Sequence, residues 1–155
     1  MQSVLILYAT FTGNTREAAL YLFNTLPKNF PNLKCSLASI WEIKNSQELL
    51  TYDAIIFGSS TWGDGVNPDA ERFLVEMARQ NIDLSPVPIA LFGLGDSAFE
   101  KFCGSIPDIK KNLEKFGAVL YSEIFTLDGY PTPEKLEPLQ IWAKKFISIV
   151  QPQEK

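Results

Sequence analysis

Apolar residues along this chain follow two alternating patterns. Short, mostly apolar runs predict strands at residues 3–9, 33–38, 52–60, 87–95 and 118–127. Between them, apolar residues recur at helical spacing, which predicts helices at residues 14–26, 67–81, 106–117 and 132–150, with a short helix or turn at 39–50. Strands that alternate with amphipathic helices predict an α/β fold, a doubly wound parallel sheet with helices on both faces.

Local signals mark several helix ends. Asn67 is expected to cap the second long helix, with Pro68 at its first position, and Gly117 to end the third. Pro138 is compatible with the last helix only near its first turn or at a kink. Residues 1–150 are predicted to form one domain, with 151–155 as a frayed tail.

Composition narrows the classes of function. The chain has 155 residues, 14 Lys and Arg against 18 Asp and Glu, and a net charge of -4. This balance argues against nucleic acid or an anionic membrane as a partner, but it permits a protein with a basic patch. No apolar run reaches the length of about 18 residues that a membrane span needs, so we expect a cytoplasmic protein.

The chain contains no histidine, which excludes Ser-His-Asp and Cys-His catalysis and the usual zinc sites. The two cysteines show neither metal-ligand spacing nor a disulfide framework. No metal site is therefore expected, and any redox chemistry should belong to a bound cofactor.

The first strand is followed by "TFTGNT", which is rich in hydroxyl and amide side chains. The candidate binding residues are Thr10, Phe11, Thr12, Gly13, Asn14 and Thr15. Side-chain donors at the start of a helix, beside a glycine that permits close approach, suit a phosphate group. The stretch matches neither the Walker pattern nor GxGxxG, so a terminal monophosphate fits better than a triphosphate. An ordinary N-cap and tight turn is the alternative.

The third strand leads into "SSTWGDG". Ser60 and Thr61 offer hydroxyls, and Trp62 beside Gly63 offers a flat surface for stacking. The alternative is that Trp62 packs over its own loop.

The fourth strand ends in "GLGDSAFEKFCG". Amides around Gly95 and Asp96 can face the edge of a planar ligand, and Phe99 supplies a second aromatic face. Core packing is the alternative for Phe99 and the favoured interpretation for Phe102, and Cys103 is expected to be a small apolar filler whose backbone N–H matters more than its thiol. A phosphate cradle and a flat aromatic slot at one sheet edge fit flavin mononucleotide (FMN) best, because ligands of doubly wound sheets bind at the carboxyl ends of the strands.

The segments "TFTGNT", "STWGDG" and "GLGDSAFEKFCG" resemble, in order and spacing, the three FMN-binding loops of flavodoxins. "FTLDGYP" resembles the end of a short-chain flavodoxin. The resemblance implies a flavodoxin-like, five-stranded parallel sheet of order 2-1-3-4-5 with FMN at its carboxyl edge. It also implies a single-electron carrier without substrate turnover of its own.

Carried over by position, the resemblance implies that the first loop holds the phosphate, helped by Ser60 and the Trp62 side chain. Trp62 and Phe99 would sandwich the flavin ring, and Gly63 would face its N5 atom. The full implied set also includes Thr61, Leu94, Gly95, Asp96, Lys101, Phe102 and Cys103. The chain departs from the usual pattern in having phenylalanine in place of tyrosine at position 99, and a lysine at position 101.

The family implies two redox partners, a reductase that donates electrons and a low-potential acceptor enzyme, which would dock on a monomer. An acidic rim around the flavin is expected from Asp64, Asp69, Asp96, Glu100 and Asp128. Two alternatives remain at this point: an FMN protein dedicated to one enzyme system, and a binding module without flavin.

Overall fold

Five parallel strands form the centre of a three-layer fold in this computed structural model, which describes residues 2–10, 13–62, 65–98 and 103–150. The order across the sheet is β2-β1-β3-β5-β6. The parallel strands are β1 (Gln2–Ala9), β2 (Leu33–Ser39), β3 (Ala54–Trp62), β5 (Ile89–Gly95) and β6 (Phe125–Asp128). Counting these five alone, the order is 2-1-3-4-5, so the predicted topology is confirmed. The short β4 (Gly65–Val66) pairs antiparallel with β3.

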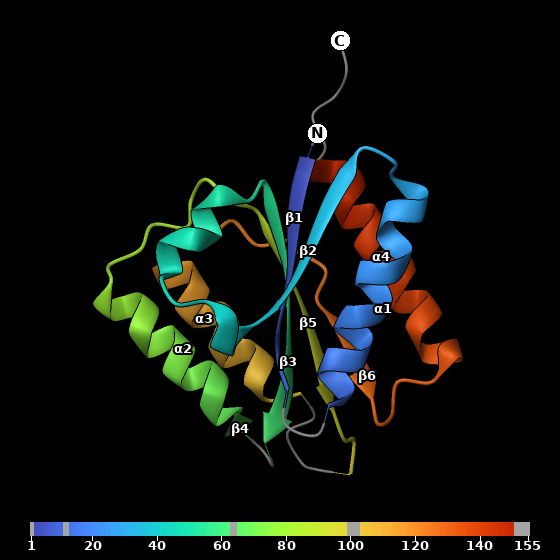
Figure 1. The fold of residues 1–155 in the computed structure, drawn as a ribbon. Coiled ribbons are helices and arrows are strands. Elements are labelled where there is room, and N and C mark those ends of the chain that lie inside the picture. The colour runs from blue at the N-terminus through green and yellow to red at the C-terminus, as the bar shows by residue number, and fades with distance from the viewer. Residues whose placement is uncertain (1, 11–12, 63–64, 99–102, 151–155) are drawn as a thin grey trace.

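Two helices cover each face of the sheet (Figure 1). One face carries α1 (Asn14–Asn29) and α4 (Pro133–Val150), and the other carries α2 (Pro68–Arg79) and α3 (Ser105–Lys115). The 3-10 segments η1 (Ile40–Glu42) and η2 (Ser46–Thr51) occupy the stretch expected to be a short helix or turn. No described helix is long and apolar enough to cross a membrane.

The core lies in two clusters, one on each side of the sheet. The predicted apolar face of α1, formed by Ala18, Leu22 and Leu26, is fully buried against β1 and α4. On the other face, Leu74 and Met77 of α2 are buried. The centre of the sheet is thus buried on both faces, as its continuous apolar runs predicted.

Two elements continue past their predicted ends. Strand β3 continues to Trp62, through residues expected to lie in a loop. Helix α1 continues through Pro27 to Asn29. Helix α4 agrees with its predicted range, and Pro138 lies near its start, in the second turn.

The expected strand at 118–127 is mostly wrong, since only β6 at its end is a strand. Leu120 makes an isolated bridge with Ile89, and pairing resumes two residues out of register where Phe92 meets Phe125. The intervening chain therefore contains two extra residues, and the Trp142 Nε1 atom donates to the Glu123 carbonyl at 2.7 Å. Apolar composition alone did not reveal this bulge at the edge of the sheet.

Candidate functional site

The carboxyl ends of β1, β3, β5 and β6 meet at one edge of the sheet, at the bottom of Figure 1. We call it the carboxyl edge. The connections that follow β1, β3 and β5 are the three segments selected from the sequence. Parallel pairing therefore brings their described residues together at one end of the molecule, as expected for a doubly wound sheet.

Helix α1 starts at this edge without a side-chain cap. Its N-cap is Gly13, whose φ of 95° lies in the left-handed region, and it makes no side-chain capping bond. The Gly13 backbone N–H donates to Thr10 Oγ1 at 3.0 Å, which closes the end of the preceding loop. By contrast, helix α2 is capped by the Asn67 side chain, which accepts from the Asp69 N–H. The start of α1 therefore offers backbone donors to a ligand, whereas that of α2 does not.

Thr15, in the first turn of α1, adds a side-chain donor at the same place. The residue is fully buried, and its hydroxyl has no hydrogen-bond partner among the described residues. Leaving a buried hydroxyl unpaired costs about 1–3 kcal/mol. A phosphate at the uncapped helix start would accept hydrogen bonds from this hydroxyl and from the first-turn N–H groups. The donor set therefore fits a phosphate group.

Ser60, near the end of β3, presents a second donor. Its Oγ accepts from Asn67 Nδ2 at 2.7 Å, so its own proton is left to donate elsewhere. Asn67 is buried, and its other amide atom caps α2. The same side chain thus orients Ser60 and begins the helix. Sequence reasoning identified Asn67 only as a cap.

Thr61 points elsewhere. Its Oγ1 lies 3.0 Å from Ser105 Oγ and also accepts from the Ser105 backbone N–H at 3.4 Å. The hydroxyl therefore satisfies the start of α3, which the sequence did not suggest. A contact between the Thr61 hydroxyl and a cofactor is not supported by this geometry, and Thr61 stays in the predicted site only through its backbone.

Gly95, the last residue of β5, packs closely against Cys103. A Cβ atom on Gly95 would lie 2.9 Å from the Cys103 backbone nitrogen, so only glycine allows this approach. Cys103 is buried with a φ of 51°, and burial raises the pKa of its thiol to about 11. The prediction that Cys103 is a small filler is therefore confirmed. Leu94 is buried in the core, so it can reach a ligand only through its backbone.

Two acidic residues order the chain beyond Gly95. Asp96 Oδ1 accepts from the Ala98 N–H at 2.9 Å, and Asp128 accepts from both the N–H and the hydroxyl of Ser97. The bonds from Ser97 lower the pKa of Asp128 below its ordinary value. Sequence reasoning did not identify Ser97.

The structure describes three of the five residues expected to form the acidic rim. Asp96 and Asp128 are exposed, whereas Asp69 is half-buried and accepts from Trp41 Nε1 at 3.3 Å. Trp41 is itself 53% exposed. The Arg72 guanidinium lies over the Trp41 ring, 5.1 Å from the ring centroid.

Several predicted site residues lie outside the described part of the chain: Phe11, Thr12, Gly63, Phe99, Lys101 and Phe102, together with Asp64 and Glu100 of the rim. The stacking role of the Trp62 side chain is also outside it. Their roles stay predictions.

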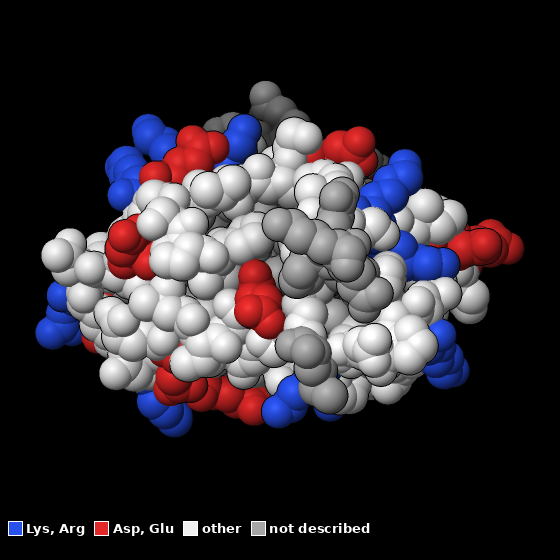
Figure 2. Space-filling model, turned by 90° about the horizontal axis from the view of Figure 1, so that it is seen from above, with Lys and Arg blue, Asp and Glu red and all other residues white. Residues whose placement is uncertain are grey.

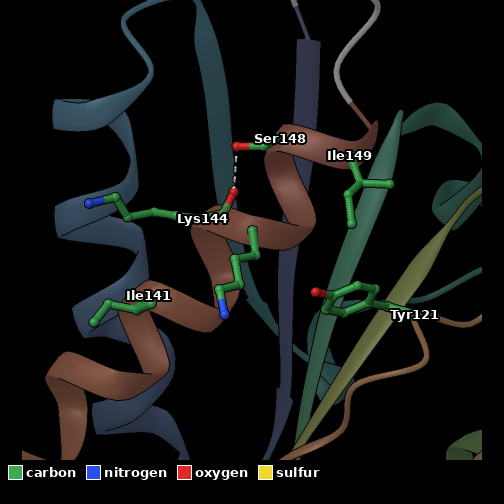
Figure 3. A pocket seen from close by; sticks show the side chains of 6 residues that line it. Tyr121, Ile141, Lys144, Ser148 and Ile149 are labelled. Carbon is green, nitrogen blue, oxygen red and sulfur yellow. Dashed lines mark hydrogen bonds between the residues drawn. The ribbon is translucent and has the colours of Figure 1, made fainter.

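A hollow elsewhere on the surface does not compete with this site. It measures about 460 Å³ and is lined by Tyr121, Ile141, Lys144, Lys145, Ser148 and Ile149 (Figure 3). The Ser148 hydroxyl donates to the Lys144 carbonyl, and α4 ends at Val150 beside Gln2, toward the opposite edge of the sheet. Seen from that edge, acidic and basic side chains are interspersed around the periphery (Figure 2). Neither feature offers a set of converging donors.

Comparison with known proteins agrees with this geometry. The flavodoxin family model matches residues 6–142. The chain is 31% identical to a flavodoxin of Maridesulfovibrio salexigens over 137 residues, 88% of this chain and 92% of that protein. It is 32% identical to the probable flavodoxin 1 of Bacillus subtilis over 152 residues, 96% of this chain and 92% of that protein.

A solved structure matches the whole fold. The oxidised flavodoxin 2 of Bacillus cereus superimposes with a TM-score of 0.84 at 34% identity, covering 95% of this chain and 99% of that one. Fold, uncapped phosphate-type helix start and sequence similarity lead to one conclusion: this chain belongs to the flavodoxin family.

Proposed function

We propose that this chain is a small FMN-containing electron carrier that passes single electrons from a reductase to a low-potential acceptor enzyme. Flavodoxins bind FMN, and this chain retains a fitting place for its phosphate. The observation that carries the proposal is the buried hydroxyl of Thr15, which has no hydrogen-bond partner in the described part of the chain, at the uncapped start of α1. A binding module that had lost its flavin would have no use for a buried donor that lowers its stability.

The phosphate would be held by neutral donors. The Thr15 and Ser60 hydroxyls and the first-turn N–H groups of α1 would donate to its oxygens, and residues 10–15 contain no Lys or Arg. The flavin ring would lie beyond, against the backbone of Gly95, Asp96 and Cys103. Thr10, Gly13 and Asn14 would shape the phosphate end of this site.

Bound FMN supplies the electron chemistry. The chain contains no histidine, and its buried Cys103 thiol stays protonated near neutral pH because its pKa is raised to about 11. The protein's contribution is therefore to bind and orient the cofactor, not to act as an acid or nucleophile. This agrees with an electron carrier without substrate turnover of its own.

We further propose that the protein is a cytoplasmic monomer whose residues 1–150 act as one FMN-binding domain. Its reductase and its acceptor would dock in turn at the acidic rim, where Asp69 and Asp96 lie beside the carboxyl edge. The net charge of -4 supports partners with basic docking surfaces.

Flavin specificity tests the proposal. The purified protein should be yellow and hold about one FMN per chain. Apoprotein titrated with FMN, riboflavin and FAD should prefer FMN. Riboflavin lacks the phosphate that would bind at α1, and the adenylate of FAD would have no path out of a buried phosphate site. A colourless protein that binds none of the three, or equal affinity for FAD, would contradict it.

A further inference from the structure

Strand β6 ends beside the point where the chain leaves β5. Asp128, its last residue, pairs with Gly95, the last residue of β5, in parallel register. The Gly129 N–H donates to the Gly95 carbonyl at 2.8 Å, which extends the ladder one step further. The backbone of β6 therefore fixes the start of the segment after β5, which is predicted to face the flavin ring.

The side chain of Asp128 reaches that segment with both carboxylate oxygens. Ser97 donates its backbone N–H to Oδ1 at 2.9 Å and its hydroxyl to Oδ2 at 2.6 Å. We call this pair of bonds the Asp128–Ser97 clasp. Hydrogen bonds to an ionised acceptor are about twice as strong as neutral ones, and two parallel bonds fix direction as well as distance. The clasp joins residues that are 31 apart in sequence.

The other described end of the same connection lies against β5. Cys103 packs so closely on Gly95 that no side chain fits there. Gly95 and Asp128 therefore hold Cys103 and Ser97 at the two described ends of this connection.

We propose that Asp128 is a positioning residue for the flavin ring. Its carboxylate fixes the backbone at Asp96 and Ser97, and thereby sets the affinity for the ring and not for the phosphate. The proposal rests on the proposed function, in which the backbone of Gly95, Asp96 and Cys103 faces the flavin. Asp128 was expected only as part of the docking rim, but both of its oxygens are already engaged within the protein.

The ring and phosphate contributions separate when two flavins are compared. Riboflavin carries the ring and lacks the phosphate, so loss of a ring-positioning contact should weaken FMN and riboflavin by the same factor. We expect Asp128→Ala to lower both affinities about tenfold, the size of one charge-assisted hydrogen bond. Circular dichroism of the bound flavin should change as well, because it reports the surroundings of the ring.

Isosteric and control variants distinguish geometry from charge. Asp128→Asn keeps an acceptor for the Ser97 N–H and can donate to its hydroxyl, so it should restore most of the affinity. Ser97→Ala should lower the affinity for both flavins in the wild-type protein. In the double variant with Asp128→Ala it should cause no further loss. Asp108→Ala removes an exposed carboxylate from α3 and should leave both affinities unchanged.

The experiment titrates each apoprotein with FMN and with riboflavin, after urea unfolding has shown that it is folded. If Asp128→Ala fails to fold, Ser97→Ala carries the same comparison. Flavin affinities within twofold of wild type in both variants, or a loss confined to FMN, would overturn the proposal. A docking role alone would appear as equal effects of Asp128→Ala and Asp128→Asn on electron transfer with unchanged flavin binding. A wild-type protein that binds no flavin would instead refute the proposed function.

Discussion

Replacing Thr15 by valine should make the apoprotein more stable and lower its affinity for FMN. Valine has nearly the shape of threonine and a similar helix propensity, so the change removes little except the hydroxyl. That hydroxyl is fully buried and lacks a partner among the described residues. Since an unpaired buried polar group costs about 1–3 kcal/mol, the free energy of unfolding of the apoprotein should rise by about 1 kcal/mol.

The effect on the cofactor has the opposite sign. A hydrogen bond to a charged group contributes about 1.5–3 kcal/mol, so loss of the bond to phosphate should weaken FMN about tenfold to a hundredfold. Riboflavin affinity should not change, because riboflavin has no phosphate.

Urea unfolding of the apoproteins and fluorescence titration with the two flavins measure both effects. Thr25→Val is a matched control on the same helix: its hydroxyl donates to the Tyr21 carbonyl at 2.8 Å, so its loss should not stabilise the apoprotein or alter FMN binding. If Thr15→Val destabilised the apoprotein and left FMN affinity unchanged, Thr15 would be a structural residue and the phosphate would lie elsewhere.

Three further predictions concern the rest of the site. Gly95→Ala would place a Cβ 2.9 Å from the Cys103 nitrogen, so it should lower the free energy of unfolding by about 1–3 kcal/mol and weaken riboflavin, as measured by urea unfolding and titration. The Asp128 pKa is lowered by Ser97 from 3.8; the clasp should therefore be complete above that pH and be lost as the pH falls through the lower folded value. As the pH falls below 3.8, riboflavin affinity should fall less in Asp128→Asn than in wild type, and identical profiles would contradict this assignment. Electron transfer from a reductase should slow as salt rises toward about 0.1 M, where the screening length is about 10 Å; stopped-flow rates independent of salt would argue against the acidic rim.

The sequence predicted the sheet and its helices because burial leaves a periodic signal. Strands β1, β3 and β5 are buried on both faces and read as continuous apolar runs. The edge segment before β6 also reads as apolar, yet Val119 is 61% exposed and the pairing slips. Composition reports that a segment is apolar, but not whether its neighbour's backbone stays in register.

The candidate site, too, was only partly predictable from the sequence. Hydroxyls gathered where a strand meets a helix predicted the donors at Thr15 and Ser60. The hydroxyl of Thr61, equally suited by type, is instead bound by Ser105, 44 positions away. Asp128 and Ser97 likewise meet only because β6 ends beside β5. Side-chain partners that depend on the three-dimensional neighbourhood carry no local signal in the sequence.

The register slip before β6 also affects how this protein behaves among copies of itself. An uninterrupted outer strand offers a row of unpaired N–H and C=O groups on which another chain can assemble. The outer strand β2 has seven residues, but on the other side of the sheet the outer strand β6 has only four, and the chain before it slips two residues out of register with β5. A second molecule therefore finds no continuous template along this side. The irregular β6 edge disfavours aggregation by strand addition on that side of the sheet.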